Sequence, residues 1–179
     1  MPSSATVIET QRLILRPPEI GHFEDLYSMW SDPEVVGHVT GHPLTREDTW
    51  ARLLRSVGHW AALGFGHWVV FEKLNGTFVG EVGFVRHMRG ISDDFDRALE
   101  IGWMLARRAQ RLGYASEAVA AALGWADESW PQTDTVCIIS PNNVASLKLA
   151  SKFAYQAEYE ALYKDKPVLV CRRSTNLHL

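Results

Sequence analysis

Hydrophobic and polar residues follow two kinds of pattern along the chain, and each predicts one kind of element. Apolar residues at helical spacing predict helices over 19–30, from Thr45 to a break at Gly64, over 113–130 and from Pro141 to Phe153. Alternating or continuous apolar runs predict strands. These strands cover residues 10–16, 67–72, 77–85, 98–105, 135–139, 156–163 and 168–173.

Turn and capping residues set the limits of these elements. Pro17 and Pro18 stop the first strand, and Asn75-Gly76 is a strong signal for a two-residue hairpin. Thr45, with Asp48 three residues on, predicts the start of a helix. Residues 86–96 are charged and contain glycine, so we expect a mobile loop there.

The order of elements predicts an α/β protein with a mixed sheet and helices on both faces. No stretch rich in Gly, Ser or Pro divides the chain. We therefore expect one domain over residues 1–179, with its core at about 9–173.

Composition and charge narrow the class of protein. The chain has 18 Lys and Arg against 21 Asp and Glu, a net charge of −3, which argues against a nucleic-acid binder. Its two cysteines cannot form a disulfide framework, and its apolar runs are too short to span a membrane. With no visible signal peptide, we expect a cytoplasmic protein without membrane contact.

The segment from Glu100 to Ala118 contains Gln110-x-x-Gly113-x-Ala115 where a strand gives way to a helix. Small residues at a helix N-terminus let an anion approach the backbone N–H groups. The alternative is tight packing of strand against helix, and the glycine alone does not decide between the two. The pattern is neither a P-loop nor a dinucleotide-binding Gly-x-Gly-x-x-Gly motif.

A second segment makes the interpretation specific. Ser140-Pro-Asn-Asn-Val-Ala-Ser146 leads into a helix that ends Lys152-Phe-Ala-Tyr155. Together the two segments resemble the acyl-CoA site of the GNAT N-acetyltransferase superfamily. The opening Glu9-Thr-Gln-Arg-Leu-Ile-Leu-Arg-Pro17 and the Asp32-Pro33 pair resemble its RimJ/RimL-like branch, the ribosomal-protein-alanine acetyltransferases. The similarity runs from about residue 9 to 173, with Gln11 and Ala154 replacing the usual Glu and Gly.

The resemblance implies a GNAT-like acyl-CoA N-acyltransferase fold, with a central mixed sheet splayed between the strands 98–105 and 135–140. It implies acetyl-CoA as the cosubstrate and CoA as a product. Asn143 would bind the pantetheine arm, and no metal is expected. The other cofactor-binding residues that it implies are Trp103, Met104, Leu105, Gln110, Arg111, Leu112, Gly113, Tyr114, Ala115 and Ser116.

Three residues are candidates for catalysis. Glu100 is the preferred general base, with Glu81 on the neighbouring strand as the alternative, because the position of a carboxylate decides its role. Ser146 would donate a proton to the thiolate or orient it; the alternative is a Ser that bonds its own helix. Tyr155 and Cys137 are expected to be packing residues. The histidines show no metal-ligand spacing, and His67 is expected to be partly exposed.

The implied reaction is transfer of an acetyl group to a primary amine by direct attack in a ternary complex. The preferred acceptor is the N-terminal α-amine of a protein or peptide. A small-molecule amine acetyltransferase and a non-catalytic acyl-CoA-binding sensor are the alternatives. Nucleic acid is not an expected partner, and a homodimer remains open.

Overall fold

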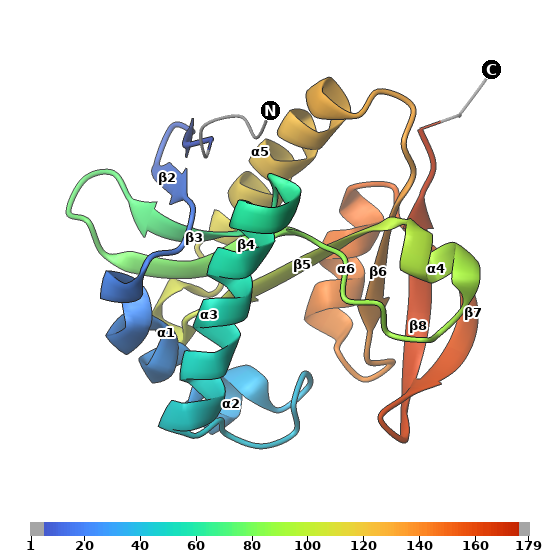
Figure 1. Ribbon diagram of the computed structural model, residues 1–179, viewed down its shortest axis with the longest axis horizontal. Coiled ribbons are helices and arrows are strands. Elements are labelled where there is room, and N and C mark those ends of the chain that lie inside the picture. The colour runs from blue at the N-terminus through green and yellow to red at the C-terminus, as the bar shows by residue number, and fades with distance from the viewer. Residues whose placement is uncertain (1–5, 176–179) are drawn as a thin grey trace. The chain divides into compact units, whose positions relative to one another are not determined.

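The computed structural model describes residues 6–175 (Figure 1). Its chain divides into two compact units, one with residues up to Gly83 and Gly102–Ala122, the other with Phe84–Ile101 and the chain from Leu123. Both ends of the predicted domain 1–179 lie outside the described residues. The division does not test whether the chain folds as one domain, so that prediction stands as made.

In the first unit, strands pair in the order β1 (Ile8–Glu9), β2 (Leu13–Arg16), β3 (His67–Glu72) and β4 (Phe78–Val85), with the end of β5 (Leu99–Leu105) next to β4. The predicted single strand over 10–16 is wrong. Residues 10–12 form a turn, in which Thr10 donates its backbone N–H to the Leu13 carbonyl, and Ile8 pairs with Leu15. The strand β3 has the bounds that its sequence pattern predicts.

Helices of this unit cover its strands. They are η1 (Ile20–His22), α1 (Phe23–Trp30), α2 (Pro33–Val36), α3 (Arg46–Leu63), η2 (Arg107–Ala109) and the first part of α5 (Tyr114–Ser129). The capping box of Thr45 and Asp48 starts α3 as predicted, and Gly64 ends it at φ 76°. A buried core joins α1, α2 and α3 to the sheet, and it includes Leu26, Trp30, Leu53, Val69, Phe78 and Met104.

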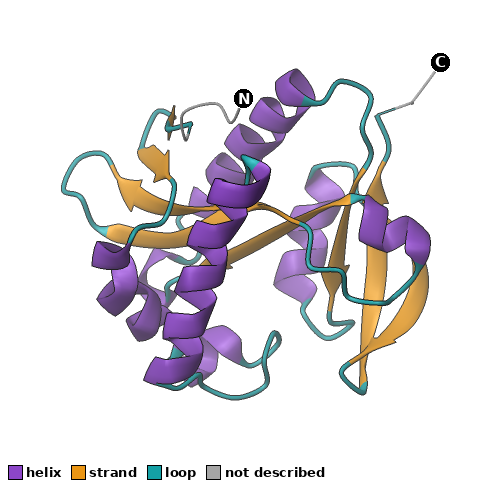
Figure 2. Ribbon diagram, viewed as in Figure 1, coloured by secondary structure: helices purple, strands orange, loops and turns teal. Residues whose placement is uncertain are grey.

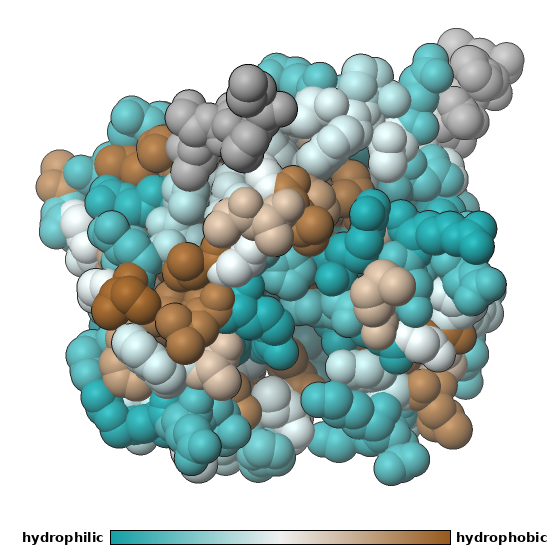
Figure 3. All heavy atoms as spheres, viewed as in Figure 1, coloured by the Kyte–Doolittle hydropathy of each residue, from teal (hydrophilic) through white to brown (hydrophobic). Residues whose placement is uncertain are grey.

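The outer side of α3 is partly apolar. Trp50, Leu54 and Leu63 are each at least 40% exposed. Figure 3 shows brown, apolar residues gathered where Figure 1 draws α1 and α3. Because Leu53 and Trp60 of the same helix are buried, the apolar surface of α3 extends beyond the part that packs in the core.

In the second unit, the start of β5 pairs in parallel with β6 (Thr135–Ile139), which pairs antiparallel with β8 (Lys166–Arg173). The last strand, β7 (Gln156–Tyr163), pairs antiparallel with β8, with a bulge between Ala157 and Tyr159, and ends the order of described strands. Parallel and antiparallel pairs in one sheet confirm the predicted mixed α/β class.

Two helices belong wholly to this unit, α4 (Asp93–Arg97) and α6 (Val144–Lys152). The expectation of a loop throughout 86–96 is wrong, because α4 occupies its second half (Figure 2). Ser92 caps α4 by accepting a hydrogen bond from the Phe95 backbone, and the buried Phe95 packs with Val136 and Val170. One apolar residue among three aspartates is too weak a pattern to predict a helix.

Ala154, which follows α6, has φ 62°, the left-handed conformation that favours glycine. We expect Ala154→Gly to raise the free energy of unfolding by about 0.5–1 kcal/mol. Relief of roughly 1–2 kcal/mol of left-handed strain exceeds the entropy cost of a new glycine. A thermal melt should show a gain of about 2 °C.

The control for this variant is Ala120→Gly, at an exposed position inside α5. There glycine relieves no strain, and it should lower stability by about 1 kcal/mol. A lower melting temperature for Ala154→Gly would contradict the strain argument.

Candidate active site

The segment predicted to bind phosphate lies at the N-terminus of α5. The strand β5 ends at Leu105, η2 follows, and α5 begins at Tyr114. Between them, Arg111 (φ 64°) and Gly113 (φ 81°) both take the left-handed conformation. Such turns direct backbone N–H groups to one side, and the N-terminus of a 16-residue helix adds positive potential. This backbone offers N–H donors and positive potential to an anion without a P-loop.

Arg12 lies in the turn between β1 and β2, and its side chain holds the segment that precedes α5. Its guanidinium donates from Nη1 to the Leu112 carbonyl at 3.0 Å and from Nε to Glu117 at 2.7 Å. It also lies 4.5 Å from the centre of the Tyr114 ring. Thr10 donates to the same Glu117 carboxylate at 2.6 Å. The segment is therefore fixed by side chains 100 or more positions away in the sequence, which sequence patterns did not reveal.

Glu117 shows the electrostatic effect of these contacts. Partial burial by itself raises the pKa of this carboxyl. Hydrogen bonds from Thr10 and from the backbone and side chain of Arg12 outweigh burial, so the pKa lies below its usual range. Glu117 is consequently ionised at neutral pH and pairs with Arg12 in the first turn of α5.

Glu81 lies inside β4 and is only 4% exposed. Its Oε1 accepts from Nη2 of Arg52 on α3 at 3.3 Å and lies 3.8 Å from Nδ1 of His67 on β3. Next to it, Gly80 lets β4 and β5 approach closely, since a Cβ there would lie 2.1 Å from the Met104 carbonyl oxygen. His67 is buried, contrary to the prediction of partial exposure.

Glu100, the other candidate base, lies on β5 and is 5% exposed. Both of its oxygens accept from Arg89, at 2.8 Å from Nε and 2.6 Å from Nη2. Arg89 also lies over the Tyr163 ring at 4.6 Å. Burial alone would lower the pKa of Arg89, but the paired Glu100 raises it above its usual value. Glu100 is thus held by a tight bidentate ion pair.

Asn143 and Ser146 meet at the start of α6. Asn143 is the N-cap, and its Oδ1 accepts from the Ser146 backbone N–H at 3.1 Å. The helix contains no tyrosine. Tyr155, just beyond it, is buried and hydrogen-bonds with Thr135, and burial raises its pKa. Ser146 is therefore the hydroxyl that α6 presents near its N-terminus.

The predicted site residues fall in both units. Glu81 and the segment 103–116 belong to the first, and Glu100, Asn143 and Ser146 belong to the second. The first unit thus contains a buried carboxylate and the helix start that is predicted to bind an anion. The second contains a paired carboxylate and a capped helix start.

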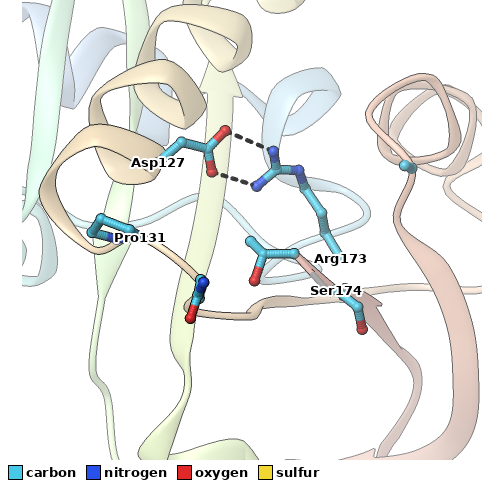
Figure 4. Close-up of a pocket in the computed structure, with 7 residues that line it drawn as sticks. Asp127, Pro131, Arg173 and Ser174 are labelled. Carbon is cyan, nitrogen blue, oxygen red and sulfur yellow. Dashed lines mark hydrogen bonds and ion pairs between the residues drawn. The ribbon is translucent and has the colours of Figure 1, made fainter. Parts of the chain in front are cut away.

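Two surface hollows contain none of the predicted site residues. One, of about 440 Å³, is lined by residues after α5 and around β8, including Asp127, Pro131, Arg173 and Ser174 (Figure 4). Arg173 binds both oxygens of Asp127, at 2.7 and 2.8 Å, and this pair raises the pKa of the arginine. The other hollow, of about 400 Å³, lies between α1 and residues 106–108.

Cys137 is buried opposite Cys171 on the neighbouring strand. Among residues 6–175, no three His, Cys, Asp or Glu side chains gather as a metal site would require. Nor does any described helix combine the length and apolar character needed to cross a membrane.

Comparisons with known proteins agree with the resemblance in the sequence. A family profile for the GNAT acetyltransferase domain matches residues 12–156. The protein YkkB of Bacillus subtilis (strain 168) is 27% identical over 179 residues, covering 97% of this chain and 98% of YkkB.

Solved structures show the same fold. A protein of Bordetella pertussis assigned to the GnaT-family acetyltransferases aligns with a TM-score of 0.85 and 29% identity, over 94% of this chain and 99% of that one. RimL, a ribosomal L7/L12 alpha-N-protein acetyltransferase in complex with coenzyme A, aligns with a TM-score of 0.77. At 15% identity, over 97% of this chain and all of RimL, that likeness is one of fold.

Gly113→Ala tests the phosphate-binding segment. A side chain at φ 81° is strained whatever the space around it, so the substitution strains the turn that shapes this segment. We expect binding of coenzyme A to weaken by roughly tenfold, about 1.4 kcal/mol, in isothermal titration.

Gly124→Ala is the matched control, because Gly124 is helical and a Cβ there meets nothing within 4 Å. This variant should bind coenzyme A as the unchanged protein does. Equal affinities for all three proteins would show that residues 110–116 do not hold the phosphates.

Proposed function

The chain belongs to the GNAT family of acetyltransferases, and from this premise we propose that it acetylates the N-terminal α-amine of a protein or peptide. Acetyl-CoA is the cosubstrate and supplies an acyl thioester. The observation that carries the proposal is the braced helix start at residues 110–116, whose backbone suits the pyrophosphate of this molecule.

Two observations support an α-amine as acceptor. The opening segment resembles the RimJ/RimL-like branch, and RimL itself is named as an alpha-N-protein acetyltransferase. An α-amine also costs about 1 kcal/mol to deprotonate at pH 7, against about 4.6 kcal/mol for a lysine side chain. A chain with only a few candidate bases acts more easily on the first.

The proposed reaction is direct attack of the neutral amine on the thioester carbonyl. A carboxylate accepts the proton that the ammonium loses, the C–N bond forms and the C–S bond breaks. Ser146 donates a hydrogen bond or a proton to the departing sulfur. The proposed cofactor-binding residues are those between Trp103 and Ser116 that the sequence indicated, together with Asn143.

The contacts of the two carboxylates favour Glu81 as the base over Glu100, which the sequence preferred. Both oxygens of Glu100 are engaged by Arg89 at hydrogen-bonding distance. The contacts of Glu81 with Arg52 and His67 are longer, and both involve Oε1. Glu81 therefore has an oxygen outside these contacts to take a proton. Glu100 remains the alternative.

Glu81→Gln should lower kcat/KM by about 100-fold or more, since a general base contributes roughly 10²–10⁴-fold. Glu100→Gln should keep turnover within about tenfold of the unchanged enzyme, once folding has been checked by thermal melting. Release of CoA thiol from acetyl-CoA measures both. The reverse ranking would make Glu100 the base.

The acceptor is tested with two peptides of the same sequence. One has a free N-terminal α-amine and a blocked lysine, and the other has a blocked N-terminus and a free lysine. We expect acetylation mainly on the α-amine, located by mass spectrometry. Acetyl groups mainly on lysine would refute the proposed acceptor.

A panel of small amines extends the same assay. Turnover with a small amine and with neither peptide would favour a small-molecule acetyltransferase. Coenzyme A binding without turnover on any amine would favour the alternative of a non-catalytic acyl-CoA-binding sensor.

A further inference from the structure

Arg52 is a half-buried arginine, with a side chain 22% exposed, that pairs with a carboxylate only 5% exposed. It projects from α3, and its guanidinium carbon lies 3.7 Å from the centre of the Trp30 ring. Nη2 donates to Oε1 of Glu81 at 3.3 Å. Its Nε is buried without a hydrogen-bond partner among residues 6–175. The ring and one carboxylate oxygen therefore fix this cation.

Two other arginines show what a tight ion pair looks like in this protein. Arg89 binds both oxygens of the buried Glu100. Arg46, six residues before Arg52 on α3, binds both oxygens of the exposed Glu24 and lies over the rings of Phe23 and Tyr27. Arg52 instead reaches a single oxygen of Glu81.

Stability alone does not explain such an arrangement. A buried ion pair repays the cost of desolvation only with close contacts and satisfied hydrogen bonds. The Arg52–Glu81 contact is long, one N–H of the guanidinium is unsatisfied, and His67 approaches the same Oε1. The arrangement does, however, fix the orientation of a carboxylate.

We propose that Arg52 is a positioning residue for acetyl transfer: seated on Trp30, it holds Oε1 of Glu81 so that Oε2 receives the proton of the acceptor amine. The proposal rests on the assignment of Glu81 as the general base. The ammonium loses one proton to Oε2, and its nitrogen lone pair then forms the C–N bond as the C–S bond of the thioester breaks. The second proton that the nitrogen loses goes to the departing thiolate, which leaves as the CoA thiol. Arg52 keeps its protons throughout and does not touch the amine.

The test is Arg52→Met, which keeps an apolar side chain against Trp30 and removes the contact with Glu81. A misplaced base costs rate more than binding, so kcat should fall by roughly ten- to hundredfold. The KM for acetyl-CoA should stay within about twofold. Arg52→Lys keeps the positive charge but loses the planar guanidinium that lies on the Trp30 ring. Its kcat should lie between those of Arg52→Met and the unchanged enzyme.

Arg46→Met is the matched control. It removes an ion pair and ring contacts of the same kind from the same helix, at an exposed site. Its kcat and KM should both match those of the unchanged enzyme. Thermal melting and coenzyme A binding establish that each variant is folded.

A Glu81→Gln variant and the Arg52→Met/Glu81→Gln double variant separate the two proposals. If Arg52 acts through Glu81, the double variant is no slower than Glu81→Gln alone. Loss of turnover in Glu81→Gln with wild-type kcat in Arg52→Met would overturn the role of Arg52 and leave Glu81 as base. Normal turnover in Glu81→Gln would overturn both.

Should Arg52→Met fail to fold, Arg52→Lys decides the question. A lower kcat with an unchanged KM for acetyl-CoA would support the positioning role. A wild-type kcat in this variant, or an equal loss in Arg46→Met, would refute it.

Discussion

Two carboxylates buried in β-strands impose the central physical constraint on this protein. A carboxylate out of water is stable only with a cation or hydrogen-bond donors beside it. Each unit meets this demand with an arginine from outside the strand, Arg52 from α3 for Glu81 and Arg89 from the segment before α4 for Glu100. The two ion pairs differ in geometry. Arg89 binds both oxygens of Glu100, whereas Arg52 contacts one oxygen of Glu81.

Contacts between distant residues also fix the start of α5. A helix N-terminus offers N–H groups to an anion only if the preceding backbone stays open. Left-handed Arg111 and Gly113 turn the chain there, and Arg12 fastens the turn through Leu112 and Glu117. Because Glu117 neutralises Arg12, the brace adds rigidity without adding net charge. The phosphate recognition proposed at this point therefore depends mainly on the backbone.

Much of the fold could be predicted because its signals are local. The bounds of β3 and β6 follow from short runs of apolar residues, and α3 begins at a capping box of two side chains three residues apart. The two-residue strand β1 is too short to show any periodicity. It exists because β2 offers it a hydrogen-bonding edge.

The candidate site was harder to predict because its contacts are distant in sequence. Patterns picked out Glu81, Glu100 and Ser146 by residue type and order. They could not tell that Arg52, rather than Arg46 on the same helix, turns towards Glu81 across 29 positions. Arg12 binds Glu117 over 105 positions for the same reason. Such pairings are decided by tertiary packing, which a single sequence does not display.

The outermost strand, β7, has a consequence for how molecules of this protein meet. An open strand edge invites a second chain to add its own strand, a common start of aggregation. Here the bulge between Ala157 and Tyr159 interrupts the ladder. Glu158 pairs with Arg172 of β8, and the exposed Glu160 adds a carboxylate to the strand. The irregular backbone and this charge both disfavour the addition of a second strand at the edge.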